Sequence, residues 1–157
     1  MLYPLALKVI SLVILNFERS WCNTPVITIF SGSGDGQVLN QDTTWQIAHD
    51  AGSGDSVNYT STSNTVASGD AAGSQTIRRH FLPFDTSSLP NDATITDVLL
   101  KIYVTAKTFA IDSIVVVEST SASTSSLVVD DYSAIGTVAW SDAVGIDSLT
   151  LNAYNTL

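Results

Sequence analysis

Serine, histidine and aspartate are the residues of this chain whose side chains could do chemistry, because together they form the nucleophile, base and orienting group of many hydrolases. The sequence holds 21 Ser, 2 His and 13 Asp, so such a set can be drawn almost anywhere by chance. It contains no Gly-x-Ser-x-Gly turn, no His-Glu-x-x-His pair and no phosphate-binding glycine loop that ends in Lys-Ser/Thr. The sequence therefore predicts a protein that is not an enzyme.

Aspartates that could bind a metal ion fall into two stretches, Asp35 with Asp42 and Asp50 with Asp55. Ca²⁺ prefers carboxylate, amide and backbone oxygens from loops, so these four residues are the candidate calcium ligands, although neither pair has the spacing of the twelve-residue calcium-binding loop. The alternative is that each aspartate stabilises a solvated turn. The two histidines lie too far apart in the sequence to have a zinc-ligand spacing, and no other cofactor is expected.

Four aromatic residues could offer flat rings for stacking on sugars, namely Trp45, Tyr59, Tyr132 and Trp140. They lie in or beside predicted loops and short strands. The alternative is that Trp45 and Trp140 pack in the core, because Trp is highly buried on average. Asn58-Tyr59-Thr60 also matches the acceptor sequence for N-linked glycosylation, a short pattern that arises often by chance and matters only in a eukaryotic secretory route.

Composition limits the partners of the chain. Six basic residues stand against 15 acidic ones, which gives a net charge of −9 over 157 residues. Nucleic acids and anionic membranes need a basic surface, so we expect neither nucleic-acid binding nor membrane insertion. The single cysteine, Cys22, excludes a disulfide within the chain. Only 13% of the residues are charged, and the 39 Ser and Thr are typical of domains outside the cell. We therefore expect an extracellular or cell-surface location, or alternatively a virion.

The elements that must position these side chains are predicted to be strands. In residues 95–105, Val98, Leu100, Ile102 and Val104 share one face, which is the pattern of a half-buried strand. Further strands are expected at residues 24–30, 43–48, 77–84, 111–118, 127–129, 137–140 and 148–152, with a short polar hairpin around 57–62. Short strands separated by turns, without a useful helical period, predict an all-β chain folded as an antiparallel β-sandwich.

Residues 1–23 differ from the rest because a largely apolar run, interrupted by Lys8, precedes the region rich in Ser, Thr and Gly. The run is too short to span a bilayer and lacks a good signal-peptidase site. Three interpretations are open: a degenerate signal or membrane-targeting segment, a poorly defined leader from a mis-set start, and a genuine part of the fold. We divide the chain into a leader or poorly defined, signal-like N-terminal segment at 1–23 and a β-sandwich domain at 24–157.

Residues 78–104 carry the most specific motif, in which an Arg-led strand ends in Phe84-Asp85-Thr86-Ser87-Ser88-Leu89-Pro90 and a strand with Ile95-Thr96 and Leu100-Lys101-Ile102-Tyr103 follows. This segment resembles the centre of DNRLRE-type jelly-roll modules, which are similar to carbohydrate-binding modules and to phage-associated and environmental β-sandwich proteins. The later Trp-x-Glu stretch of that family is absent, so no binding residue is transferred. Such modules continue into further strands, which implies a fragment that is incomplete at its C-terminus and self-associates through an open sheet edge.

The resemblance, the composition and the missing catalytic motifs together give two expectations of function. The first is a non-catalytic, secreted module that is carbohydrate-binding-like or adhesive, with a polysaccharide or a cell-surface glycan as its partner. The second is a structural β-sandwich of a phage tail, a virion or a cell-surface assembly that binds no sugar. The motif is mainly a fold signature, and the sequence does not identify a ligand.

Overall fold

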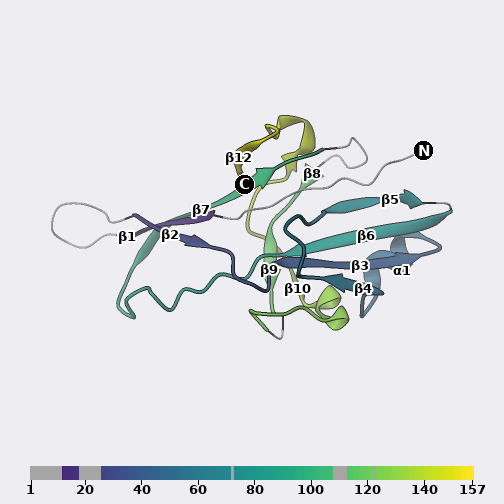
Figure 1. Ribbon diagram of the computed structural model, residues 1–157, viewed down its shortest axis with the longest axis horizontal. Helices are drawn as coiled ribbons and strands as arrows, with labels where there is room; N and C mark the ends of the chain where they lie inside the picture. The colour runs from purple at the N-terminus through teal and green to yellow at the C-terminus, as the bar shows by residue number, and fades with distance from the viewer. Residues whose placement is uncertain (1–11, 18–25, 72, 108–112, 122) are drawn as a thin grey trace.

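The computed structural model describes residues 12–17, 26–71, 73–107, 113–121 and 123–157, and for residues 12–17 and 71 it describes the backbone alone. Within these ranges the chain forms twelve strands, one short α-helix and two 3-10 helices, and every strand pair is antiparallel (Figure 1). The all-β prediction is therefore confirmed. In the described ranges, no helix has the length and apolar character needed to cross a lipid bilayer.

Sheet I has the strand order β4-β3-β6-β5 and lies in the right half of Figure 1. Its strands are β3 (Gly36–Asp42), β4 (Ser56–Asn58), β5 (Ala67–Ala71) and β6 (Ser74–Phe81). One face buries Val38, Ile77 and Phe81 in a cluster with Ala48 of α1 (Trp45–Asp50) and Tyr132 of η1 (Val129–Ser133). The two helices therefore cover one face of sheet I.

Sheet II has the order β12-β7-β1-β2 and lies in the left half of the view. Its strands are β1 (Leu12–Phe17), β2 (Val26–Phe30), β7 (Ile95–Val104) and β12 (Ala153–Thr156). Its inner face buries Ile29, Ile102 and Val104, while the strand register places Phe30 and Tyr154 on the opposite face. One face of sheet II thus packs inward and the other meets solvent.

Two short ladders complete the fold. β8 (Ser113–Ile114) pairs with β11 (Val144–Gly145), and β9 (Val117–Ser119) pairs with β10 (Ile135–Ala139). The 3-10 helix η2 (Ile146–Ser148) follows β11 directly. Ile146 of η2 and Leu149 pack against Ile102 and Val104 of β7. The buried apolar residues of the described ranges form three clusters rather than one continuous core.

Several predicted strands are confirmed. Residues 95–105 contain β7, and Ile102 and Val104 are buried on the predicted face, whereas Val98 on the same face is 54% exposed. Residues 24–30 contain β2, and β10 overlaps 137–140. The predicted strand at 77–84 corresponds to β6, which ends before Pro83 because proline has no amide hydrogen to donate to a sheet.

Other strand predictions are wrong. Residues 43–48 are mostly helical, since the Thr44 side chain caps α1 by accepting a hydrogen bond from the Ile47 amide at 3.3 Å. The described part of 111–118 is divided between β8 and β9, with Val115 51% exposed between them instead of buried on both faces. The short strands expected at 127–129 and 148–152 overlap the 3-10 helices and turns.

The segment that the sequence sets apart as a leader includes β1. The backbone of β1 pairs with β2 on one side and with β7 on the other, so it lies inside sheet II. Residues 1–11 and 18–23, with Cys22 among them, lie outside the described residues. The pairing favours the interpretation of this segment as part of the fold, while the division at residue 23 stays a prediction.

Candidate functional site

Helix α1 presents an aromatic residue to solvent. Trp45 and His49 are one helical turn apart, so their side chains lie on the same face of the helix. Their rings stack with centroids 4.5 Å apart and an interplanar angle of 22°. Trp45 is nevertheless 47% exposed. Half of a large flat side chain is therefore available to a ligand.

Polar groups surround this ring on the same helix. Nδ1 of His49 lies 2.6 Å from Oδ1 of Asp50, and the Gln46 amide donates a hydrogen bond to the other carboxylate oxygen. The bond to His49 is the main cause that lowers the pKa of Asp50, and the bond to Gln46 comes second. Asp50 is thus ionised at neutral pH and fixed in orientation. We call Trp45, Gln46, His49 and Asp50 the α1 cluster.

Two residues from other elements hold α1 in place. The Tyr132 hydroxyl donates to the Ala48 carbonyl at 2.7 Å, and Nη2 of Arg79 donates to the His49 carbonyl at 2.7 Å. Nη1 of Arg79 donates to the Tyr132 carbonyl at 2.5 Å, and the guanidinium lies 3.9 Å from the centre of the Tyr132 ring. These bonds satisfy carbonyls at the end of a helix, where no intrahelical donor remains. We call the pair the Arg79–Tyr132 clamp.

Burial determines the protonation of the clamp. It is the main cause that lowers the pKa of Arg79 and raises the pKa of Tyr132. The tyrosine therefore keeps its proton at neutral pH, and its hydroxyl donates a hydrogen bond to the Ala48 carbonyl. Sequence reasoning missed the role of Arg79, although a signal was present: in the two-residue period of β6 it takes the inward position between Ile77 and Phe81.

The four aromatic candidates do not form one binding surface. Tyr59 follows β4 and is 37% exposed, while Trp140 follows β10 and is 66% exposed. The alternative that Trp45 and Trp140 pack in the core is wrong. Tyr132 is 0% exposed, so its ring offers no stacking surface and serves the clamp instead. Among the described residues, no ring contact joins any two of the four.

The structure does not bring together Asp35 and Asp42, the first predicted pair of calcium ligands. Asp35 precedes β3 and Asp42 ends it, so seven strand steps separate them by about 23 Å. Asp35 instead accepts a hydrogen bond from the Ser31 hydroxyl at 2.6 Å and lies 2.9 Å from Nε2 of His80. The two carboxylates cannot share an ion.

The second pair, Asp50 and Asp55, also makes hydrogen bonds within the protein. Asp50 belongs to the α1 cluster, and Asp55 accepts from the Gln41 amide at 2.7 Å. In the ranges that the structure describes, no three His, Cys, Asp or Glu side chains are placed to hold one metal ion. Calcium binding at Asp50 and Asp55 stays a prediction.

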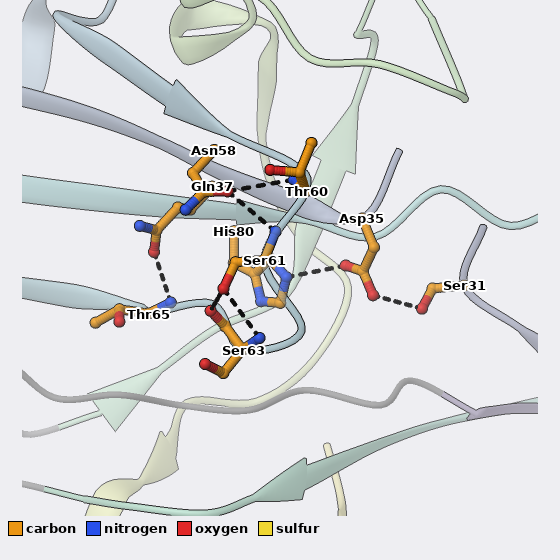
Figure 2. Close-up of polar contacts among 9 residues, drawn as sticks. All are labelled: Ser31, Asp35, Gln37, Asn58, Thr60, Ser61, Ser63, Thr65 and His80. Atoms are coloured by element: carbon orange, nitrogen blue, oxygen red, sulfur yellow. Dashed lines mark hydrogen bonds and ion pairs between the residues drawn. The ribbon is translucent and has the colours of Figure 1, made fainter. Parts of the chain in front are cut away.

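A second polar cluster lies at the other end of sheet I (Figure 2). The His80 side chain, which is 3% exposed, and the Ser31 hydroxyl bind the two different oxygens of Asp35. The serine hydroxyl is thus directed to the carboxylate and not to the imidazole, unlike the order in a Ser-His-Asp triad. The arrangement ties the turn before β3 to strand β6.

Comparison with known proteins finds no counterpart: no protein-family model, no curated protein and no solved structure matches this chain. The resemblance of residues 78–104 to DNRLRE-type modules stays a prediction, as do the jelly roll and the sugar binding that it implies.

Proposed function

We propose that the protein is a non-catalytic extracellular module that binds polysaccharide or cell-surface glycan through the α1 cluster. The observation that carries this proposal is the 47% exposed Trp45 ring beside an oriented, ionised Asp50. The apolar C–H face of a sugar stacks on an aromatic ring, and its hydroxyls donate to carboxylate and amide oxygens. The α1 cluster offers both kinds of contact on one turn of helix.

The clamp supports this role by making the site rigid. A binding site gains affinity when its side chains need little ordering on binding. Arg79 and Tyr132 fix the last carbonyls of α1 to sheet I, and the Thr44 side chain caps the first turn. Both ends of this six-residue helix are therefore held before a ligand arrives.

Charge favours a neutral glycan over an acidic one. The chain has a net charge of −9, and the α1 cluster adds an ionised carboxylate at the site itself. The cation that contacts the helix, Arg79, already binds two backbone carbonyls. Uronic acids or sulfated sugars would be repelled by this negative charge. Neutral polysaccharides are the expected ligand class.

Affinity electrophoresis in gels that contain neutral or acidic polysaccharides tests the proposal. The wild-type protein should be retarded by at least one neutral polysaccharide, and Trp45→Ala should abolish the retardation without changing the circular dichroism spectrum. Trp140→Ala is the matched control, because Trp140 is 66% exposed but lies outside the α1 cluster. Absence of retardation on every glycan, or an equal loss in both variants, would contradict the proposal.

A specific observation also favours the second function, a structural block of a phage, virion or cell-surface assembly. The outward face of sheet II exposes Val26 at 59%, Phe30 at 59% and Tyr154 at 46%. The three side chains share one face of the sheet, on its two edge strands β2 and β12, and exposed apolar side chains on one face are typical of interaction surfaces. If this second function is correct, the wild-type protein should self-associate in sedimentation velocity as its concentration rises. Its neighbouring genes should then encode virion components rather than polysaccharide-degrading enzymes.

A further inference from the structure

Asn58 ends β4, which is an edge strand of sheet I, and its side chain is exposed. It begins Asn58-Tyr59-Thr60, which is the only Asn-x-Ser/Thr sequence with x other than Pro in the chain. The function proposed for the α1 cluster does not involve this segment. The acceptor sequence thus lies outside the α1 cluster.

The loop after β4 fixes the orientation of the Asn58 carboxamide (Figure 2). Its oxygen accepts from the amides of Thr60 at 3.2 Å and Ser61 at 3.1 Å, which is an Asx-type turn. Gln37, the partner of Asn58 in the β3–β4 register, uses its own side-chain oxygen to bind the Thr65 amide at 2.6 Å. Among the described residues, no group accepts a hydrogen bond from Nδ2 of Asn58.

The remainder of the loop leaves this nitrogen accessible. Tyr59 is 37% exposed and Thr60 is exposed. The Ser61 hydroxyl donates to the Ser63 carbonyl at 2.7 Å, which folds the loop back on itself beyond the acceptor sequence. A bulky group on Nδ2 would therefore extend into solvent from the end of an edge strand without displacing a packed side chain.

We propose that Asn58 is an acceptor of an N-linked glycan when the chain enters a compartment with an oligosaccharyltransferase. Nδ2 attacks the anomeric carbon of a polyprenyl-diphosphate-linked oligosaccharide and forms a C–N bond. The anomeric C–O bond breaks, the polyprenyl diphosphate leaves with the bonding electron pair, and Nδ2 loses one proton to a base of the transferase. This inference depends on the proposed extracellular location and not on glycan binding by the α1 cluster.

The position of Asn58 gives the modification a physical consequence. Edge strands carry unpaired backbone groups that can pair with another chain, and proteins protect such edges with charge, proline or a covering group. β4 has the short sequence Ser56-Val57-Asn58, without charge or proline. A hydrated glycan at its last residue covers this edge of sheet I, so the glycosylated protein self-associates less than the same protein after glycan removal.

Expression of the full chain behind an added secretion signal in a eukaryotic host tests the proposal. Intact mass before and after peptide-N-glycosidase treatment should show one glycan, and peptide mapping should place it at Asn58. Thr60→Ser keeps the acceptor sequence and should keep the glycan. Thr60→Ala and Asn58→Gln should both lose the glycan. Thr60→Ala is the sharper test because it keeps Asn58 itself. Melting temperatures of the variants report whether they fold.

Unmodified Asn58 in wild-type protein recovered from the secretory compartment or the medium would overturn the proposal. Persistence of the glycan in Thr60→Ala would also overturn the proposal. Light scattering before and after glycan removal tests the edge-covering role separately, and equal self-association of the two forms would refute that role. Glycan binding by the α1 cluster is measured on protein made without glycosylation, so failure of one proposal is distinguishable from failure of the other.

Discussion

Sheets I and II are each covered on one face, but by different interactions. The covered face of sheet I includes a charged side chain, Arg79, whose guanidinium bonds to backbone carbonyls of α1 and η1. The inner face of sheet II near β12 is covered by apolar residues such as Ile146 and Leu149. Hydrogen bonds are directional and apolar contacts are not. Sheet I is therefore the better support for a binding site that needs fixed geometry.

Both regions nevertheless use a basic side chain to bind backbone oxygens rather than acids. At the rim of sheet II, Nζ of Lys107 donates to the carbonyls of Ile146 at 3.4 Å, Asp147 at 3.0 Å and Leu149 at 2.7 Å. The chain has 15 acidic residues and only six basic ones. Arg79 and Lys107 thus each attach a helical turn to another part of the fold through its backbone carbonyls.

The largest effect is expected from Arg79→Met, which breaks the clamp. Charge-assisted hydrogen bonds contribute roughly 1.5–3 kcal/mol each, and the carbonyls of Tyr132 and His49 lose their donor. We expect the free energy of unfolding to fall by about 3 kcal/mol in urea denaturation, together with a loss of glycan retention. Arg78→Met is the matched control: its side chain lies on the other face of β6, and it should cost within about 0.5 kcal/mol. Equal effects of the two substitutions would refute the clamp.

A smaller effect is expected from Lys107→Met at the rim of sheet II. The ammonium group is partly exposed, so water replaces some of the lost hydrogen bonds to the turn at η2, and the expected cost is about 1–2 kcal/mol. Glycan retention should be unchanged because the α1 cluster is attached to sheet I. A loss of retention in folded Lys107→Met would show that the two sheets do not act independently.

The contrast between the sheets also explains what the sequence could predict. β7 is recognisable because the buried Ile102 and Val104 alternate with half-buried positions, which is a local pattern. β3 was missed because it turns Asn40 inward, where the Ser53 carbonyl accepts its amide hydrogen at 3.1 Å. Such a residue interrupts the apolar alternation, and its partner becomes evident only in the folded chain.

The candidate site was predictable in part for the same reason. Trp45 is exposed, as a candidate for binding must be, but its alternation with Ile47 indicates a strand where the structure has a helix. The cap at Thr44 and the spacing of four residues from Trp45 to His49 were the competing helical signals. Tyr132 could not be told from an exposed aromatic residue, because its burial depends on Arg79 and Ala48, which are distant in sequence.

Phe30→Ser tests the outward face of sheet II and should barely change stability. Phe30 is 59% exposed, so its replacement should alter the free energy of unfolding by only about 0.5 kcal/mol. If this face is an assembly surface, the variant should shift the sedimentation profile toward monomer while glycan retention stays as in the wild type. If the wild-type protein self-associates and Phe30→Ser has the same sedimentation profile, the interface between copies does not lie on this face.

The smallest effect concerns the protonation of Asp50 in the α1 cluster. Hydrogen bonds, first from His49 and then from Gln46, lower its pKa below the ordinary value of 3.8. A lowered pKa in the folded state means that the ionised carboxylate favours folding. This contribution is complete above the ordinary pKa and is lost as the pH falls through the lowered pKa. Protonation of Asp50 should therefore not affect glycan retention near neutral pH. It should reduce retention only below about pH 4.

Carboxyl-carbon NMR titration of Asp50 measures this shift directly. His49→Phe keeps an aromatic ring beside Trp45 but removes the hydrogen bond, so the pKa of Asp50 should rise toward 3.8. Gln46→Met should raise it less, because the bond from Gln46 is the second cause and not the first. If Asp50 of the wild-type protein titrates at its ordinary value, or if Gln46→Met moves the pKa more than His49→Phe does, His49 does not orient the carboxylate. The α1 cluster would then present an aromatic ring without a fixed acceptor beside it.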